Sequence, residues 1–213
     1  MKTDDLAALL AGSAGPVDRA VMARRYSLAL AACVLSAGVL MGARFGIRPD
    51  ILSIMGATLF WLKLAFPAAV AAGAFLVAAR LSRPGMPVNR RWTILALPVA
   101  AVWIGALLTL GFAPASERMV MVLGQSWRTC PFNIAFLAAP GFVAIFWAMK
   151  GMAPTRLRTA GAAAGLLAGS LATIAYCFHC REMEVAFWAV WYVAGMLLPA
   201  VVGALLGPRL LRW

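Results

Sequence analysis

Six long apolar segments, separated by short connections, are the feature that most limits how this sequence can fold. A helix needs about 20 mostly apolar residues to cross a bilayer, and each segment is long enough once its edges extend by a few residues. Of the 213 residues, 64% are hydrophobic and 12% are charged, and a soluble globule of this length has too little interior to bury so much apolar surface. The segments are Tyr26–Met41, Ala57–Ala79, Trp92–Phe112, Phe132–Met149, Leu157–Tyr176 and Val185–Leu206. The sequence predicts an all-α, polytopic membrane helix bundle with six transmembrane helices.

The net charge of +12 is divided unevenly between the two sides that alternate connections would occupy. Thirteen Lys and Arg residues fall on the side that holds both termini, and five fall on the other side. The positive-inside rule therefore predicts that both termini are cytoplasmic, as expected for a protein of a bacterial inner membrane. Basic connections such as Arg80–Arg91 are then explained as topology determinants. The expected surroundings are membrane lipids, and no nucleic-acid partner is predicted.

Few polar groups lie within the predicted spans. Lys63 falls near one end of the second span beside Trp61, and we expect its side chain to extend to the membrane surface. The series Gly161, Gly165 and Gly169 places small residues on one face of the fifth span and predicts close helix packing there. The spans hold no cluster of carboxylates or histidines from which to build a catalytic site. The sequence therefore predicts neither an enzyme nor an obligatory cofactor.

The first 25 residues form the largest segment predicted to lie in the cytoplasm. Thr3 can cap a short helix whose first turn carries two aspartates, which suit the positive end of a helix dipole. Leu6, Leu9 and Leu10 then form an apolar stripe, and Gly12, Gly15 and Pro16 end it. One interpretation is a helix lying on the membrane surface. The aspartates favour the other interpretation, a peptide that docks in a groove of a cytoplasmic partner.

Three of the four cysteines, together with the single histidine, are predicted to lie on the outer, periplasmic side. Cys130 begins the fourth span before Pro131, so it is expected at the helix N-cap, where the helix dipole favours a thiolate. Cys177 and Cys180 close the fifth span with His179 between them. Cys33 lies within the first span, where a buried cysteine needs no function.

These side chains allow more than one chemistry. Thiolate, thioether and imidazole groups are ligands for soft ions such as Cu(I), Cd(II) or Zn(II). The candidate metal ligands are Cys130, Cys177, His179, Cys180 and Met183. Met183 belongs to this set if the helix continues beyond Cys180. A switchable thiol site and a permanent disulfide that staples Cys130 to Cys180 are the other interpretations, and the sequence leaves all three open.

Several short motifs carry a family resemblance that covers essentially the whole chain. They are the opening Met-Lys-Thr-Asp-Asp-Leu, the pair Pro16-Val17, Cys130, the stretch His179-Cys180-Arg-Glu182 and the closing Gly203-Ala-Leu-Leu-Gly-Pro-Arg-Leu-Leu-Arg-Trp213. In this order, and with six spans, they resemble the NrsF family of membrane anti-sigma factors. These proteins are negative regulators of extracytoplasmic-function (ECF) sigma factors of the SigF type.

The resemblance implies that the protein sequesters an ECF sigma factor at the inner membrane and releases it under periplasmic stress. The implied signals are heavy metals, namely copper, cadmium or chromate, and oxidants. The family's paired sensing cysteines would be Cys130 and Cys180, while Cys177 has no clear place in the family pattern. The sigma factor is expected to contact the segment of residues 1–25, and residues 26–213 would form the sensor domain. The implied contacts are Thr3, Asp4, Asp5, Leu6, Leu9, Leu10, Pro16 and Val17.

A two-state bundle would account for such a signal. In this hypothesis the reduced protein holds the sigma factor. Oxidation or metal binding then draws the start of the fourth span toward the end of the fifth and weakens the docking surface. The main rival is a membrane thiol-disulfide oxidoreductase that uses Cys177 and Cys180 with a quinone, although a thiol at a helix C-terminus is poorly activated. A small transporter is a third alternative.

Overall fold

The computed structural model describes residues 3–5, 9, 12, 20–86, 88 and 91–212. Within these residues, six helical segments are long and apolar enough to cross a membrane, as the sequence predicts. They are α2 (Val21–Arg44), α4 (Thr58–Leu81), α5 (Arg91–Phe112), α7 (Cys130–Lys150), α8 (Leu157–Cys177) and the sixth span, Val185–Leu210. The predicted all-helical, six-span fold is therefore confirmed.

The sixth span is not a uniform α-helix. It begins with α9 (Val185–Phe187), continues through the π-helical turn η1 (Trp188–Tyr192) and ends with α10 (Val193–Leu210). Isolated π-helical turns in longer helices often occur at functional sites. Two short helices, α3 (Ile51–Ile54) and α6 (Ala115–Leu123), lie in connections between spans. The connections thus contribute ordered structure at one end of the bundle.

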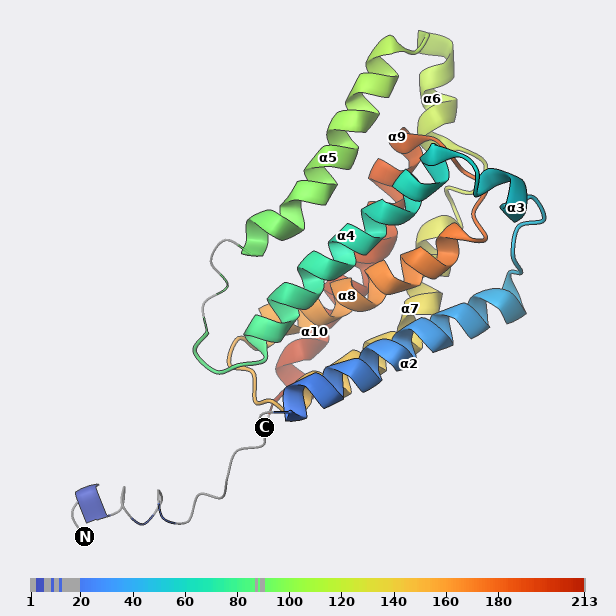
Figure 1. The fold of residues 1–213 in the computed structure, drawn as a ribbon. Helices are drawn as coiled ribbons and strands as arrows, with labels where there is room; N and C mark the ends of the chain where they lie inside the picture. The colour runs from blue at the N-terminus through green and yellow to red at the C-terminus, as the bar shows by residue number, and fades with distance from the viewer. Residues whose placement is uncertain are drawn as a thin grey trace.

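Helix α8 lies at the centre of the bundle and packs against α2, α4, α7 and α10 (Figure 1). Its closest neighbour is α10, and glycine makes this approach possible. A Cβ atom on Gly161 would collide with the backbone carbonyl of Gly203, and one on Gly165 would collide with the carbonyl of Pro199. The glycine series of the fifth span therefore forms the close packing surface that the sequence predicts.

Helix α5 lies at the edge of the bundle and leans away from it (Figure 1). It packs against α4 and against the first part of the sixth span, while most of its apolar side chains remain exposed. Helix α2 borders the opposite side along α7, where the sulfur of Cys33 fills the space above Gly141. Cys33 thus packs as a small apolar residue.

The connections of residues 45–57, 113–129 and 178–184 lie at one end of the bundle, here named the cysteine end (Figure 1). The start of α2 and the end of α10 lie at the other end, here named the terminal end. Tyr26 and Ser82 share a buried hydrogen bond of 2.8 Å at the terminal end, where the Arg25 guanidinium also lies 5.2 Å from the ring centre of Trp147. The two ends are therefore held by different kinds of contact.

Candidate thiol site

Three buried thiols converge at the cysteine end from separate parts of the chain. Cys130 is the first residue of α7, Cys177 is the last residue of α8, and Cys180 lies in the connection that follows. All three are free cysteines. Thr129, rather than Cys130, occupies the N-cap of α7, so the predicted cap position is wrong by one residue. Cys130 nevertheless lies in the first turn, where the helix dipole acts most strongly.

Cys130 and Cys180 interact with each other across two elements of the fold. Each of these two thiols acts directly on the ionisation of the other. The interaction with Cys130 lowers the pKa of Cys180 below that of an ordinary thiol, because it stabilises the thiolate, and the positive charge of Lys63 acts in the same direction. Burial opposes both effects.

Cys177 is oriented differently from the pair. Its thiol donates a weak hydrogen bond to the carbonyl oxygen of Lys63 in α4, at 3.8 Å. Helix α8 ends at Cys177, so Cys177 and Cys180 do not continue along one helical face toward Met183. The arrangement therefore separates the two cysteines of the C-x-x-C sequence, and Cys180 is engaged with Cys130 instead.

The structure adds a residue that the sequence interpretation misplaced. The side chain of Lys63 has an exposed fraction of 0%, so it does not extend to the membrane surface as predicted. Its ammonium donates hydrogen bonds to the carbonyl oxygens of Cys180 and Glu182, at 2.6 and 2.8 Å. It also lies 5.7 Å from the ring centre of Tyr192. An ionisable residue inside a span is a functional candidate by default, and this signal was available in the sequence.

Arg48 supports the same connection from a second direction. Its guanidinium donates to the carbonyl oxygen of Cys180 at 3.3 Å and to the sulfur of Met183 at 3.9 Å. It is held by two hydrogen bonds to the carboxylate of Asp50, at 2.8 and 2.7 Å. These bonds lower the pKa of Asp50 to about 2 and raise the pKa of Arg48. The carbonyl of Cys180 thus accepts hydrogen bonds from two cations.

The side chain of Glu182 ties two connections together. One carboxylate oxygen accepts hydrogen bonds from the backbone N–H of Gln125 and from the N–H and hydroxyl of Ser126, at 2.7, 3.1 and 3.2 Å. Gly124 precedes these donors with a φ of +55°, and a Cβ there would lie 2.6 Å from the carboxylate. Glycine is needed at this position for both reasons. The carbonyl oxygen of Ser126 then accepts a bond of 2.9 Å from the N–H of Cys130.

Tyr192 brings a phenol to the site from the π-helical turn η1. Its hydroxyl is buried and has no hydrogen-bond partner among the residues that the structure describes. The phenol interacts electrostatically with the three thiols. Buried polar groups in proteins are normally hydrogen-bonded, and the thiols of Cys177 and Cys180 are the groups with which this hydroxyl interacts.

The predicted metal ligands are not all directed toward one point. The Nδ1 atom of His179 lies 3.0 Å from the carbonyl oxygen of Gly46, and the sulfur of Met183 is bonded to Arg48. In the described part of the chain, no group of three or more His, Cys, Asp or Glu side chains is arranged to hold a metal ion. A soft-metal site remains a prediction that would require these side chains to move.

The predicted partner-binding residues are only partly described. Thr3, Asp4, Asp5 and Leu9 are helical and exposed. Thr3 is itself helical instead of preceding the helix as its cap. Of the residues predicted to end the helix, Gly12 is helical, and Gly15 and Pro16 lie outside the described residues. The other predicted contacts, Leu6, Leu10, Pro16 and Val17, lie outside the described residues.

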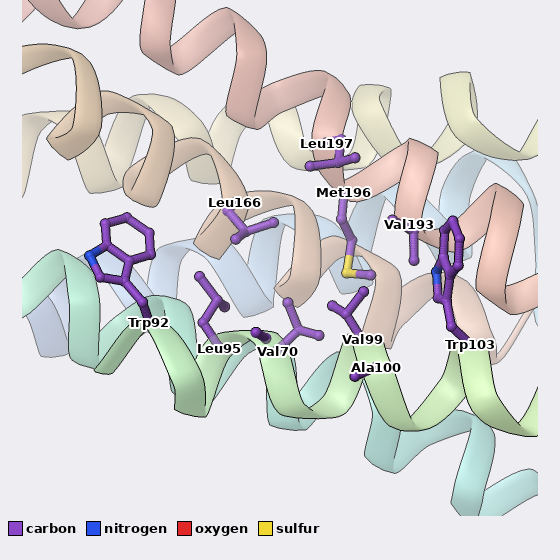
Figure 2. A pocket seen from close by; sticks show the side chains of 11 residues that line it. Val70, Trp92, Leu95, Val99, Ala100, Trp103, Leu166, Val193, Met196 and Leu197 are labelled. Atoms are coloured by element: carbon purple, nitrogen blue, oxygen red, sulfur yellow. The ribbon is translucent and has the colours of Figure 1, made fainter. Parts of the chain in front are cut away.

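A groove of about 650 Å³ lies between α5 and the bundle, apart from the thiols (Figure 2). Trp92 and Trp103, both on α5, stand at its two ends, and Met196 points into it from α10. Every lining side chain is apolar or aromatic. The groove therefore offers room for hydrocarbon, but it supplies no charged group for chemistry.

Comparison with known proteins assigns the chain to a family. The family described as "Negative regulator of sigma F", NrsF, matches residues 10–213. A "Probable anti-sigma-F factor NrsF" of Azospira oryzae is 44% identical over 213 residues, which cover all of both chains. An "Anti-sigma-F factor NrsF" of Caulobacter vibrioides is 34% identical over 214 residues, again covering both chains completely. No solved structure matches the chain.

The six long apolar helices are typical of a polytopic membrane protein. The chain belongs to the NrsF family of negative regulators of sigma F. The family resemblance predicted from the sequence is confirmed.

Proposed function

We propose that this protein is an inner-membrane anti-sigma factor that holds a SigF-type ECF sigma factor and releases it when Cys130 and Cys180 are oxidised. The names of the relatives support the anti-sigma role. The observation that carries the sensing role is the pair of buried, directly interacting thiols contributed by α7 and by the connection after α8. These two thiols belong to elements far apart in sequence, so a bond between them changes how the spans are held.

The proposed orientation places the cysteine end in the periplasm and both termini in the cytoplasm. It rests on the thirteen basic residues on the terminal side, against five on the other. The periplasm is an oxidising compartment, so thiols there meet oxidants directly. Residues 1–25 would hold the sigma factor in the cytoplasm, and residues 26–213 would sense the signal.

The proposed reaction is the formation of one disulfide. The Cys130 and Cys180 thiols together lose two protons and two electrons to a two-electron oxidant, and one S–S bond forms. The bond replaces a flexible thiol contact by a fixed geometry, with Cβ atoms about 3.5–4.5 Å apart. We expect this change to shift α7 relative to α8 and, through helix packing, to alter the terminal end.

A population shift of this kind has a known energetic requirement. Moving a two-state equilibrium from 1:99 to 99:1 takes about 5.5 kcal/mol of differential stabilisation. The disulfide supplies this stabilisation only through contacts that differ between the two conformations, because its usual effect on stability is a restraint on the unfolded chain. The fraction of sigma factor released therefore depends on how differently the two conformations accommodate the bond between Cys130 and Cys180.

The test is a transcriptional reporter that depends on the cognate sigma factor. We expect the wild-type strain to activate the reporter when treated with diamide, a thiol oxidant. Cys130→Ser and Cys180→Ser strains should not respond, and they should still repress the reporter without stress. Cys33→Ser is the matched control, because Cys33 is a buried cysteine packed against Gly141 and distant in the fold from the pair.

Two further arms separate the alternatives. Cadmium or copper that activates the reporter without producing a disulfide would indicate metal ligation by the same cysteines. Normal activation in both the Cys130→Ser and the Cys180→Ser strains would show that the cysteines are not the sensor.

Co-purification of a sigma factor with the full-length protein, and its loss when residues 1–19 are deleted, tests the proposed docking segment.

A further inference from the structure

Lys63 connects α4 to the connection that carries Cys180, and this contact is unusual for a membrane span. The ammonium lies in the second turn of α4 and is completely buried. Two of its three N–H donors are directed to main-chain oxygens of Cys180 and Glu182, at 2.6 and 2.8 Å. A buried charge is costly unless hydrogen bonds compensate it, so this contact strongly restrains the backbone it holds.

The restraint extends from Lys63 to both cysteines of the pair. The backbone of Cys180 is bonded to the ammonium directly. The side chain of Glu182 holds Ser126, and the carbonyl of Ser126 accepts the N–H of Cys130. Lys63 therefore lies at one end of a continuous series of hydrogen bonds that fixes where each cysteine sits relative to the other.

The surroundings indicate that Lys63 serves the thiols rather than an ion pair. Among the thiols, its strongest electrostatic partner is Cys180, followed by Cys177 and then Cys130. The ion pair at this end is made instead by Arg48 and Asp50. The charged and titratable groups that face Cys180 are Arg48, Lys63, Cys130, Tyr176, Cys177 and Tyr192.

We propose that Lys63 is the positioning residue of the thiol switch: its buried ammonium holds the Cys180–Glu182 backbone so that Cys180 stays against Cys130. The proposal rests on the proposed function in one respect, since it takes the bond between Cys130 and Cys180 as the signal. Lys63 does not react itself. When diamide oxidises the pair, the N=N group of diamide takes up the two protons and two electrons that the thiols lose.

The experiment uses the full-length protein in lipid nanodiscs and the variant Lys63→Met, which keeps side-chain length and removes the donors and the charge. Two rates are measured by peptide mass spectrometry: disulfide formation between Cys130 and Cys180 with diamide, and labelling of each cysteine by N-ethylmaleimide without oxidant. We expect about tenfold slower disulfide formation, because Cys180 loses the restraint that raises its effective concentration near Cys130. Labelling of Cys180 should become faster, because release of the connection exposes its sulfur, and this gain should exceed the loss of thiolate that follows removal of the Lys63 charge.

Three controls make the result specific. Cys33, in the contact between α2 and α7, reports general loosening of the bundle and should stay unlabelled. Leu62→Met changes the neighbouring, exposed residue of α4 and should leave both rates as in the wild type. Lys63→Arg keeps the charge and the donors, so it should recover disulfide formation to within about threefold of the wild type.

The proposal is overturned by any of three results. The first is disulfide formation in Lys63→Met at the wild-type rate. The second is labelling of Cys33 and Cys180 by N-ethylmaleimide at equal rates in that variant. The third is disulfide formation in Lys63→Arg that is as slow as in Lys63→Met. The reporter separates this inference from the proposed function. If Lys63→Met forms the disulfide slowly but still activates the reporter normally, the sensing role alone is refuted. If the Cys130→Ser and Cys180→Ser strains fail to activate the reporter while Lys63→Met forms the disulfide at the wild-type rate, the positioning role alone is refuted.

Discussion

Helices α8 and α5 show that apolar character and burial are separate properties in this molecule. Of the six spans, α8 is the least apolar and α5 is the most apolar. Yet 72% of the most apolar part of α8 is buried within the protein, against 6% for α5. Lipid solvates leucine as well as a protein interior does, so apolar side chains alone do not draw helices together. Small residues do, because they allow close backbone contact.

A matched pair of leucines provides the largest expected difference between the two helices. Leu167 on α8 is buried, whereas Leu97 on α5 has an exposed fraction of 71%. We expect Leu167→Ala to lower the free energy of unfolding by about 2–5 kcal/mol, since it leaves a cavity in the core. Leu97→Ala should change it by less than about 0.5 kcal/mol. Unfolding in mixed micelles with increasing SDS measures both, and equal losses would contradict the comparison.

A glycine pair tests the close contact itself. Gly161→Ala places a methyl group against the backbone carbonyl of Gly203, which a side-chain movement cannot relieve. We expect a loss of about 3 kcal/mol, at the upper end of the usual cost of overpacking. Gly105→Ala on α5 is the control, because its new methyl group would meet Val185 at an ordinary 3.4 Å. Thermal unfolding followed by circular dichroism should separate the two variants clearly.

Loss of the polar contacts of Glu182 should have the next largest effect on the free energy of unfolding, because these contacts attach the connection after α6 to the bundle. Glu182→Ala removes three hydrogen bonds to Gln125 and Ser126. We expect a loss of about 2 kcal/mol, as for a hydrogen-bonded charge that is partly exposed. Hydrogen exchange at the Gln125 and Ser126 amides should accelerate. Glu184→Ala alters a neighbouring, exposed carboxylate and serves as the control; unchanged exchange in Glu182→Ala would refute the role of the contact.

The smallest expected effect concerns one hydrogen bond between the sixth span and α6. The indole of Trp191 donates to the carbonyl oxygen of Val122 at 2.8 Å and packs against the ring of Trp127. Trp191→Phe removes the donor but retains an aromatic ring, so we expect a loss of about 1 kcal/mol. Trp103→Phe on α5 should be close to neutral. Chemical unfolding followed by tryptophan fluorescence, with each variant's own baseline, provides the measurement.

The fold could be predicted from the sequence because membrane spans have a simple physical signature. Length and apolar composition located all six, and the glycine series located the most buried helix. The exposure of α5 could not be predicted in the same way. Hydropathy measures how well a helix is solvated by lipid, and it carries no information about which other helices it packs against.

The thiol site could be predicted in outline but not in detail. The parity of the connections placed Cys130 and Cys180 at one end of the bundle, and the structure pairs them. The burial of Lys63 was missed because the ammonium of a lysine near the end of a span can be solvated in two ways. It can reach the membrane surface, or it can donate hydrogen bonds to carbonyl oxygens inside the protein, as it does here. Only the path of residues 178–184 decides between them, and that path depends on tertiary contacts.

The π-helical turn of the sixth span has a consequence for any change in its length. A regular α-helix turns by about 100° per residue, so each position is tied in orientation to every other. The wide turn Trp188–Tyr192 adds a residue to one turn and uncouples the two parts of the span. Tyr192 can therefore face the thiols while Gly203 keeps its register against Gly161. Deleting one residue here would rotate the two parts of the span relative to each other, so that Tyr192 could not face the thiols while Gly203 packs against Gly161.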